Sequence, residues 1–147
     1  NGYQDKYPNI RVCFAHGGQL TQMNLGRRIQ GFDGRPDLFE GKSHPRKAVG
    51  HPNIFFDTLV HDTESFELIV RRIKSTDQIL MGLDDPYPLG EMESDRQSSY
   101  PGKLLDLCVE RDIITKKQHA EIWEDNVLRW LGADQDEEMR KRIMSNA

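Results

Sequence analysis

The sequence predicts an α/β fold, and more narrowly the C-terminal part of a (β/α)8 barrel, with about three strands and their helices. Apolar stretches alternate with helical ones in the order strand, helix, strand, helix, strand, helices, which is typical of a parallel sheet with helical crossovers. Two of the apolar stretches end in a polar side chain and a glycine or proline loop, where barrels carry their functional groups. A closed barrel takes about 250 residues, so a chain of 147 residues predicts an incomplete one.

The first strand is expected at residues 10–15, which lead into His16 and the glycines Gly17 and Gly18. Leucine, methionine and isoleucine residues at loosely helical spacing then predict a helix over 20–32. Residues 34–45 are rich in turn formers and charges, which predicts a long surface connection. An imidazole is therefore expected where the first strand gives way to a glycine loop.

The second strand is expected at 54–60, where β-branched and aromatic residues follow one another. The polar segment 61–63 is suited to cap a helix over 64–74. A third strand at 78–81 leads into Asp84 and a loop rich in proline. A carboxylate is therefore expected at the end of the third strand.

The rest of the chain predicts helices. One is expected over 101–109, after an exposed polar insertion at 94–100. Thr115 has the side chain of a helix cap and predicts a helix over 116–131, which Gly132 would end.

The chain divides into a barrel segment, residues 1–132, and a charged C-terminal tail, residues 133–147. It begins with Asn1 and enters a core strand almost at once. We therefore expect it to be the C-terminal part of a longer protein.

The composition narrows the class of protein. The balance of 20 Lys and Arg against 24 Asp and Glu, with no long basic block, predicts no nucleic-acid partner. No apolar run approaches the roughly 18 residues of a membrane span, and Cys13 and Cys108 fall in apolar stretches. A cytosolic protein with reduced thiols is expected.

His16 and Asp84 are the first candidates for chemistry. An imidazole beside two glycines can hydrogen-bond or deprotonate a metal-bound water, although a histidine that bonds a loop carbonyl fits the local pattern equally well. A carboxylate at a strand end can bind a divalent cation or hold a water, but such an aspartate is more often a cap or a turn residue. One histidine and one aspartate at two strand ends together predict a metal or acid–base site.

Further side chains suit substrate binding. The loop 86–90 has two prolines and can hold Tyr87 over a flat substrate, although it serves packing equally well. Arg27 and Arg28 follow the His16 loop, and guanidinium groups match carboxylates, although most such arginines only solvate a helix. The sequence contains no Cys-x-x-Cys, His-x-His, P-loop, Gly-x-Ser-x-Gly or Gly-x-Gly-x-x-Gly motif, which weighs against zinc-finger, nucleotide-binding and Ser/Cys-nucleophile functions.

Four segments occur in a recognisable order, namely 12–18 Val-Cys-Phe-Ala-His-Gly-Gly, 35–38 Arg-Pro-Asp-Leu, 59–62 Leu-Val-His-Asp and 82–91 Gly-x-Asp-x-Pro-Tyr-Pro-Leu-Gly-Glu. They resemble the C-terminal half of the aminocarboxymuconate-semialdehyde decarboxylase family, in the amidohydrolase superfamily of metal-dependent barrels. The resemblance runs from about Pro8 to Gly132. It implies a zinc enzyme of the kynurenine pathway, which removes carbon dioxide from its semialdehyde substrate and so limits quinolinate formation.

The resemblance also implies roles for single residues. His16 matches the histidine after the sixth barrel strand, which activates the metal-bound water, and Asp84 matches the aspartate ligand after the eighth. Arg27 aligns with an arginine that reaches into the partner's site of a homodimer and grips a substrate carboxylate. Tyr87 aligns with an aromatic residue beside the substrate, whereas Asp85 stands where the family usually has Tyr.

The family's other metal ligands, a first-strand His-x-His and a fifth-strand His, have no counterpart in the chain. Catalytic zinc generally takes three protein ligands, so the chain alone is expected to be inactive. Two alternatives stay open. One is another amidohydrolase-type decarboxylase or hydrolase of an aromatic or unsaturated carboxylate, and the other is a truncated, non-catalytic protein that dimerises or regulates through its helices.

Overall fold

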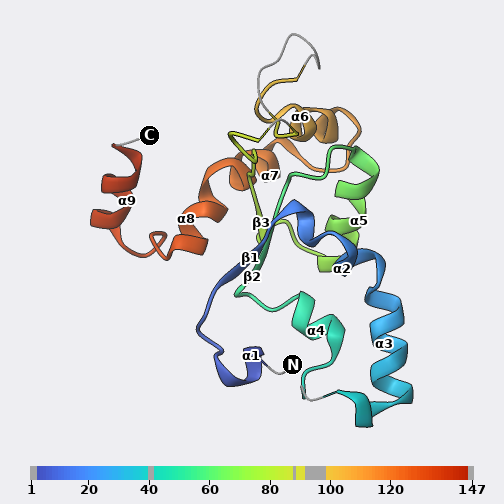
Figure 1. Cartoon of the computed structure of the whole chain (residues 1–147). Helices are drawn as coiled ribbons and strands as arrows, with labels where there is room; N and C mark the ends of the chain where they lie inside the picture. Colours follow the sequence, from blue (N-terminus) through green and yellow to red (C-terminus); the bar gives the residue numbers. More distant parts are fainter. Residues whose placement is uncertain (1–2, 40–41, 88, 92–98, 146–147) are drawn as a thin grey trace.

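The computed structural model describes residues 3–39, 42–87, 89–91 and 99–145. Its centre is a parallel sheet in which β2 (Ile54–Asp57) lies between β1 (Val12–Phe14) and β3 (Ile79–Leu80). The strands are shorter than expected, but all three fall inside the expected ranges. The α/β class with a parallel sheet is therefore confirmed (Figure 1).

The strand register divides the sheet residues between two faces, because successive side chains alternate. Phe14, Phe56 and Ile79 lie in one row. Asp57 and Leu80 lie in the next row, on the opposite face. The carboxylate that ends β2 therefore belongs to the face turned away from Phe56.

The helices that follow the strands supply the main core, which joins Phe56 of the sheet to Phe66 and Ile69 and to Leu105. The first of them after β2 begins at Asp62, whose carboxylate accepts the Ser65 N–H at 2.7 Å, so the predicted cap is confirmed. Figure 1 places α2 to α5 on one side of the sheet. The bounds are α2 (Leu20–Met23), α3 (Leu25–Gly34), α4 (Pro45–Val49), α5 (Thr63–Ile73) and α6 (Lys103–Glu110).

The C-terminal helices lie on the other side of the sheet, where Figure 1 shows α8 and α9. Thr115 caps the first of them, as predicted. The amide of Asn126 donates to the carbonyl oxygens of Thr76 and Ile79, both at 2.8 Å, and ties α8 to the amino end of β3. The bounds are α7 (Lys116–Ala120), the π-helical turn η3 (Glu121–Asp125), α8 (Asn126–Leu131) and α9 (Glu137–Met144).

Several elements differ from the sequence-based expectations. The helix expected over 20–32 is divided into α2 and α3 at Asn24, and the helix expected over 116–131 contains the π turn. The connection 34–45 holds a 3-10 turn, η2 (Pro36–Leu38), and another short helix, α1 (Tyr3–Lys6), precedes β1. Most of the insertion expected at 94–100 lies outside the described residues.

The charged tail forms α9, a helix without buried residues. Within the described ranges, no helix combines the length and the apolar character needed to cross a membrane.

Candidate active site

His16 opens the 3-10 turn η1 (His16–Gly18), two residues after β1, in a backbone conformation that few residues other than glycine adopt. Its φ is 54°, and Gly17 and Gly18 follow at 61° and 70°. A Cβ on Gly17 would lie 2.5 Å from side-chain atoms of Ile69 and Val60, so only glycine lets the loop approach α5 this closely. The predicted glycine loop is present, and its packing against α5 fixes the position of the His16 backbone.

His16 lines a cavity of about 320 Å³, between α2, α5 and the loop that follows β2. His61, which also follows a strand, lines the same cavity, as does Gln22. The Gln22 side chain is 2% exposed, and neither its amide nitrogen nor its amide oxygen has a hydrogen-bond partner among the described residues. The cavity therefore brings together two histidines and a buried amide, of which sequence reasoning singled out only His16.

Asp84 stands in the loop after β3, with a φ of 58° and a half-buried side chain. Its carbonyl oxygen accepts the Tyr87 N–H at 2.8 Å, which closes a turn through the proline loop. At the far end of this loop, the Glu91 carboxylate accepts the backbone N–H groups of Gly102 at 3.1 Å and Leu104 at 2.7 Å. The loop that carries Asp84 is thus fastened to the start of α6.

His16 and Asp84 follow the two outer strands and stand at the same carboxyl edge of the sheet. His16 lies two residues beyond the end of β1, and Asp84 lies four residues beyond the end of β3. The structure places both residues at this edge, but Asp84 does not line the cavity that contains His16.

Asp57 stands between them, as the last residue of β2. Its Oδ1 accepts the N–H groups of Gly17 at 2.9 Å and Leu59 at 3.1 Å. Burial, and to a lesser extent the charge of Asp57, raises the pKa of the Cys13 thiol to about 11. Sequence reasoning missed Asp57, although a strand that ends in a carboxylate is the same signal that singled out Asp84.

Arg27 and Tyr87 lie apart from this edge cavity. Arg27 is exposed on α3, and Tyr87 is 63% exposed in the proline loop. Neither residue lines the cavity that contains His16. Within this chain, the structure therefore does not bring the two predicted substrate-binding residues to His16.

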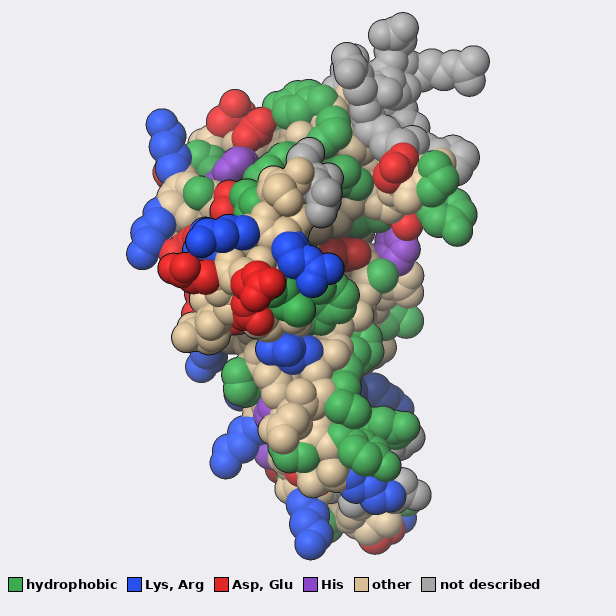
Figure 2. All heavy atoms as spheres, turned by 90° about the vertical axis from the view of Figure 1, so that its left-hand side faces the viewer, with side chains coloured by type: hydrophobic (Ala, Val, Ile, Leu, Met, Phe, Trp, Pro, Cys, Tyr) green, Lys and Arg blue, Asp and Glu red, His purple; other side chains and the backbone are tan. Residues whose placement is uncertain are grey.

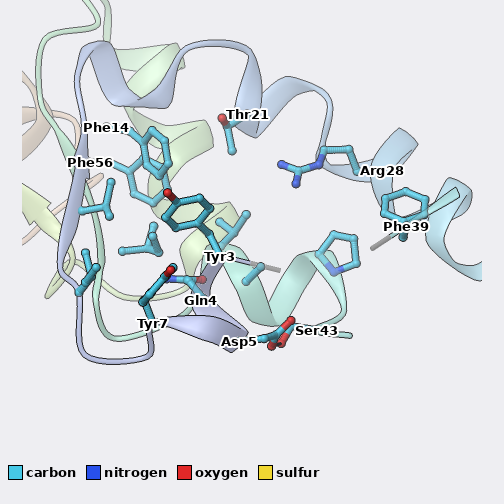
Figure 3. Close-up of a pocket in the computed structure, with 16 residues that line it drawn as sticks. Tyr3, Gln4, Asp5, Tyr7, Phe14, Thr21, Arg28, Phe39, Ser43 and Phe56 are labelled. Carbon is cyan, nitrogen blue, oxygen red and sulfur yellow. Dashed lines mark hydrogen bonds between the residues drawn. The ribbon is translucent and has the colours of Figure 1, made fainter. Parts of the chain in front are cut away.

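A larger hollow, of about 470 Å³, lies beside β1 (Figure 3). Tyr3, Phe14 and Phe56 line it, and Arg28 extends toward it from α3. Phe14 is 43% exposed, and its strand, β1, is one of the two outer strands of the sheet. Arg28 was one of the arginines that the sequence suggested for carboxylate binding, but His16, Asp84, Arg27 and Tyr87 do not line the hollow, so we do not assign the chemistry to it.

The face of the molecule that carries the C-terminal helices has a mixed surface. Figure 2 shows hydrophobic side chains gathered along one flank of its lower part, and acidic and basic side chains mixed over its upper part. Among the described residues, this face presents no large block of a single charge.

The resemblance implies a divalent metal ion at the carboxyl edge. Asp84 offers the carboxylate oxygen that zinc and manganese accept, and His16 offers an imidazole. The described residues nevertheless contain no group of three His, Cys, Asp or Glu side chains that could hold a metal ion. These residues fit one side of a metal site and do not complete it.

Curated relatives match most of the chain. The 2-amino-3-carboxymuconate-6-semialdehyde decarboxylase of Dictyostelium discoideum is 34% identical over 135 residues, which are 90% of this chain and 34% of that protein. The protein of the same name from Caenorhabditis elegans is 39% identical over 92 residues, 61% of this chain and 22% of that protein. The chain thus spans at most about a third of the length of these relatives. No family model matches it.

Solved structures match the fold. The 5-carboxyvanillate decarboxylase of Sphingomonas paucimobilis has a TM-score of 0.65 and 15% identity, over 88% of this chain and 36% of that one. A dihydroxybenzoic acid decarboxylase from Polaromonas sp. JS666, solved with bound manganese, has a TM-score of 0.67 and 16% identity, over 92% and 38%. The 4-oxalomesaconate hydratase of Rhodopseudomonas palustris has a TM-score of 0.65 and 19% identity, over 100% and 42%.

At such identities the structures establish the fold alone, and the prediction of an incomplete (β/α)8 barrel is confirmed. The sequence matches are closer and run through nearly the whole chain. The chain is therefore a relative of the 2-amino-3-carboxymuconate-6-semialdehyde decarboxylases, and corresponds to about a third of their length.

Proposed function

We propose that this chain forms the C-terminal part of a metal-dependent decarboxylase whose active site lies at the carboxyl edge of the sheet. One observation carries the proposal: His16 and Asp84 follow the two strands that flank β2, in a chain 34% identical to a named decarboxylase over 90% of its length. Barrel enzymes place their catalytic groups at this edge. The activity belongs to the complete barrel, and the 147 residues by themselves are inactive.

The substrate we assign is 2-amino-3-carboxymuconate 6-semialdehyde, and the product is 2-aminomuconate 6-semialdehyde. The bond to one carboxylate carbon breaks, carbon dioxide leaves, and a proton is taken up at the carbon that carried it. Both curated relatives are named for this reaction. The step belongs to tryptophan breakdown through kynurenine and limits quinolinate formation in the cytosol.

The chain's own residues contribute a proton carrier, a ligand and binding groups. His16 receives and returns a proton at the reacting edge, because an imidazole changes charge near neutral pH. Asp84 supplies one ligand oxygen to a divalent cation, zinc in our proposal. Such an ion, when bound, acts as a Lewis acid and lowers the pKa of a water to about 7.

Substrate binding is the role of Arg27 and Tyr87. The exposed guanidinium of Arg27 is free to cross to a second protomer of a homodimer and neutralise a substrate carboxylate there. Tyr87 lies against the flat conjugated part of the substrate. The exposure of Arg27 outside the His16 cavity leaves its guanidinium available to a second protomer.

The test is the variant His16→Ala, made in the complete gene product that carries this sequence. Turnover should fall by a factor of about 100 to 10,000, the range of a lost general acid–base group, while the bound metal stays at the wild-type amount. His119→Ala is the matched control, because His119 stacks on Trp123, contacts Asp106 and does not line the cavity that contains His16. Unchanged turnover in His16→Ala would refute the role of His16.

A second reading is another amidohydrolase-type decarboxylase or hydrolase of an aromatic or unsaturated carboxylate. The fold match to a hydratase, which covers the whole of this chain, supports this second reading, because the same barrel can carry out other reactions. Product analysis with the semialdehyde substrate decides between the two readings. Release of one carbon dioxide per product supports decarboxylation, and a product that retains every carbon excludes it.

A further inference from the structure

The proposed function gives no role to the carboxylate of Asp57. This residue closes β2, between the strands that lead to His16 and Asp84. Its Oδ1 accepts two backbone N–H groups, from Gly17 at 2.9 Å and from Leu59 at 3.1 Å. A single oxygen atom therefore joins the loop after β1 to the loop after β2.

The hydrogen bond from Gly17 bears directly on His16, because the two residues are adjacent and both have a positive φ. A left-handed backbone is unfavourable for a residue with a Cβ, and it persists where surrounding contacts hold it. Packing against α5 holds the loop from one side. Asp57 supplies the polar contact, and hydrogen bonds to a carboxylate are stronger than those between neutral groups.

The end of β3 leaves room for this carboxylate. A Cβ at Gly82 would lie 2.7 Å from the Cβ of Asp57 and 3.0 Å from its Oδ2. Gly82 precedes Asp84 by two residues. The side chain of Asp57 is thus enclosed between the two loops that carry the proposed proton carrier and the proposed metal ligand.

We propose that Asp57 is a positioning residue for His16. It acts through the N–H of Gly17 and sets where the imidazole stands at the edge of the sheet. Its catalytic consequence rests on the proposed function, whereas the contact with the loop does not depend on any activity. A misplacement of about 1 Å at a reacting group costs about 100-fold in rate.

The test compares Asp57→Ala and Asp57→Asn with Asp62→Ala. Alanine removes the acceptor oxygen, and asparagine keeps an oxygen without the charge. Asp62 is the matched control, because its carboxylate also accepts a backbone N–H, that of Ser65 at 2.7 Å, at the start of α5. The readouts are hydrogen exchange of the Gly17 amide by NMR in the 147-residue chain, and kcat and KM of the complete gene product.

Asp57→Ala should speed exchange of the Gly17 amide at least about tenfold, since local opening sets the exchange rate. It should also lower kcat by about 100-fold with little change in KM. Asp57→Asn should recover most of kcat, and Asp62→Ala should change neither readout. Should Asp57→Ala fail to fold, Asp57→Asn decides, because a neutral acceptor weakens the bond and moves the Gly17 amide proton upfield.

Three results would overturn the inference: wild-type exchange at Gly17 in Asp57→Ala, an unmoved Gly17 resonance in Asp57→Asn, or an equal loss of kcat in Asp62→Ala. If the wild-type protein releases no carbon dioxide, the proposed function fails instead. The exchange data then still decide whether Asp57 holds the His16 loop.

Discussion

The side-chain amide of Asn126 donates a hydrogen bond of 2.8 Å to the carbonyl oxygen of Ile79 in β3, and both residues are fully buried. The same amide donates to the carbonyl oxygen of Thr76, also at 2.8 Å. One side chain of α8 therefore serves an acceptor of β3 and an acceptor of the loop before it, and the Thr76 oxygen also accepts the Ile79 N–H at 3.0 Å.

Asn126→Ala should lower the free energy of unfolding by about 1–3 kcal/mol, because the buried Ile79 acceptor is left unpaired, whereas the Thr76 oxygen keeps the Ile79 N–H. Urea denaturation followed by circular dichroism measures the change. Asn53→Ala is the control: its amide donates to the carbonyl oxygen of Pro8 at an exposed site, and its loss should be below about 1 kcal/mol. Equal losses in the two variants would contradict the structure.

Gly82→Ala should lower the free energy of unfolding by about 1–3 kcal/mol, because the new Cβ would press on the Asp57 side chain. Gly26→Ala should have the opposite effect on the free energy of unfolding. Gly26 lies inside α3, and a Cβ there would meet nothing within 4 Å. That change should raise the free energy of unfolding by about 0.5–1 kcal/mol through helix propensity. The same denaturation experiment checks both signs, and destabilisation by Gly26→Ala would be the contrary result.

The two thiols should make the stability depend on pH. Burial raises the pKa of Cys108 to about 12 and that of Cys13 to about 11, from an ordinary value of 9.0. The folded chain therefore holds these protons more tightly than the unfolded chain. The stability they contribute is fully present below a pH of about 9 and is lost as the pH rises through 11 to 12. Urea denaturation at a series of pH values measures the decline.

Cys108→Ala isolates this contribution. The fall of the free energy of unfolding above pH 9 should be smaller in the variant than in the wild type, whatever its effect at neutral pH. Lysine and tyrosine titrations are common to both proteins and cancel in the difference. A decline of the same size in both would show that the Cys108 thiol does not titrate differently in the folded chain.

The purified 147-residue chain should retain far less than one equivalent of zinc or manganese after dialysis. The described residues contain no three-ligand group, and catalytic zinc needs about three protein ligands. Elemental analysis gives the metal content, with the complete gene product as the positive control. A full equivalent on the short chain would mean that it holds a metal by itself, whereas none on the complete product would favour the non-catalytic reading.

Mixing two inactive variants tests whether Arg27 serves the partner's site. A dimer of one His16→Ala protomer and one Arg27→Ala protomer would contain one intact site, if Arg27 crosses the interface. Random pairing of equal amounts should then restore about a quarter of the wild-type rate. Each variant alone is the control, and a mixture no more active than its components would place Arg27 in its own protomer's site.

The alternation of strands and helices could be predicted because buried parallel strands and amphipathic helices leave distinct patterns in the sequence. The sequence did not predict α4, because a helix of five residues has too few turns to show a hydrophobic period. Its start depends on the His44 side chain, which accepts the Arg46 N–H, and on Pro45. Such local capping is visible only once the backbone is placed.

The sequence could indicate which residues follow the strands as candidates for the site. It could not indicate the contacts that these residues make. His16 and Asp84 stand out because each follows an apolar run. The bond between Asp57 and Gly17 spans 40 positions of sequence, and the cavity shared by His16 and Gln22 depends on how α2 meets α5. Such relations depend on tertiary packing, which no local pattern records.

The outer edge of β1 affects how the isolated polypeptide can associate. Within the described residues no strand pairs with its outer side, and Phe14 beside it remains 43% exposed. An open strand edge is a template for another strand. A second copy that covers this edge of the isolated polypeptide would bind only the folded form and so add to its stability by mass action. Such pairing would show as a melting temperature that rises with the concentration of the polypeptide.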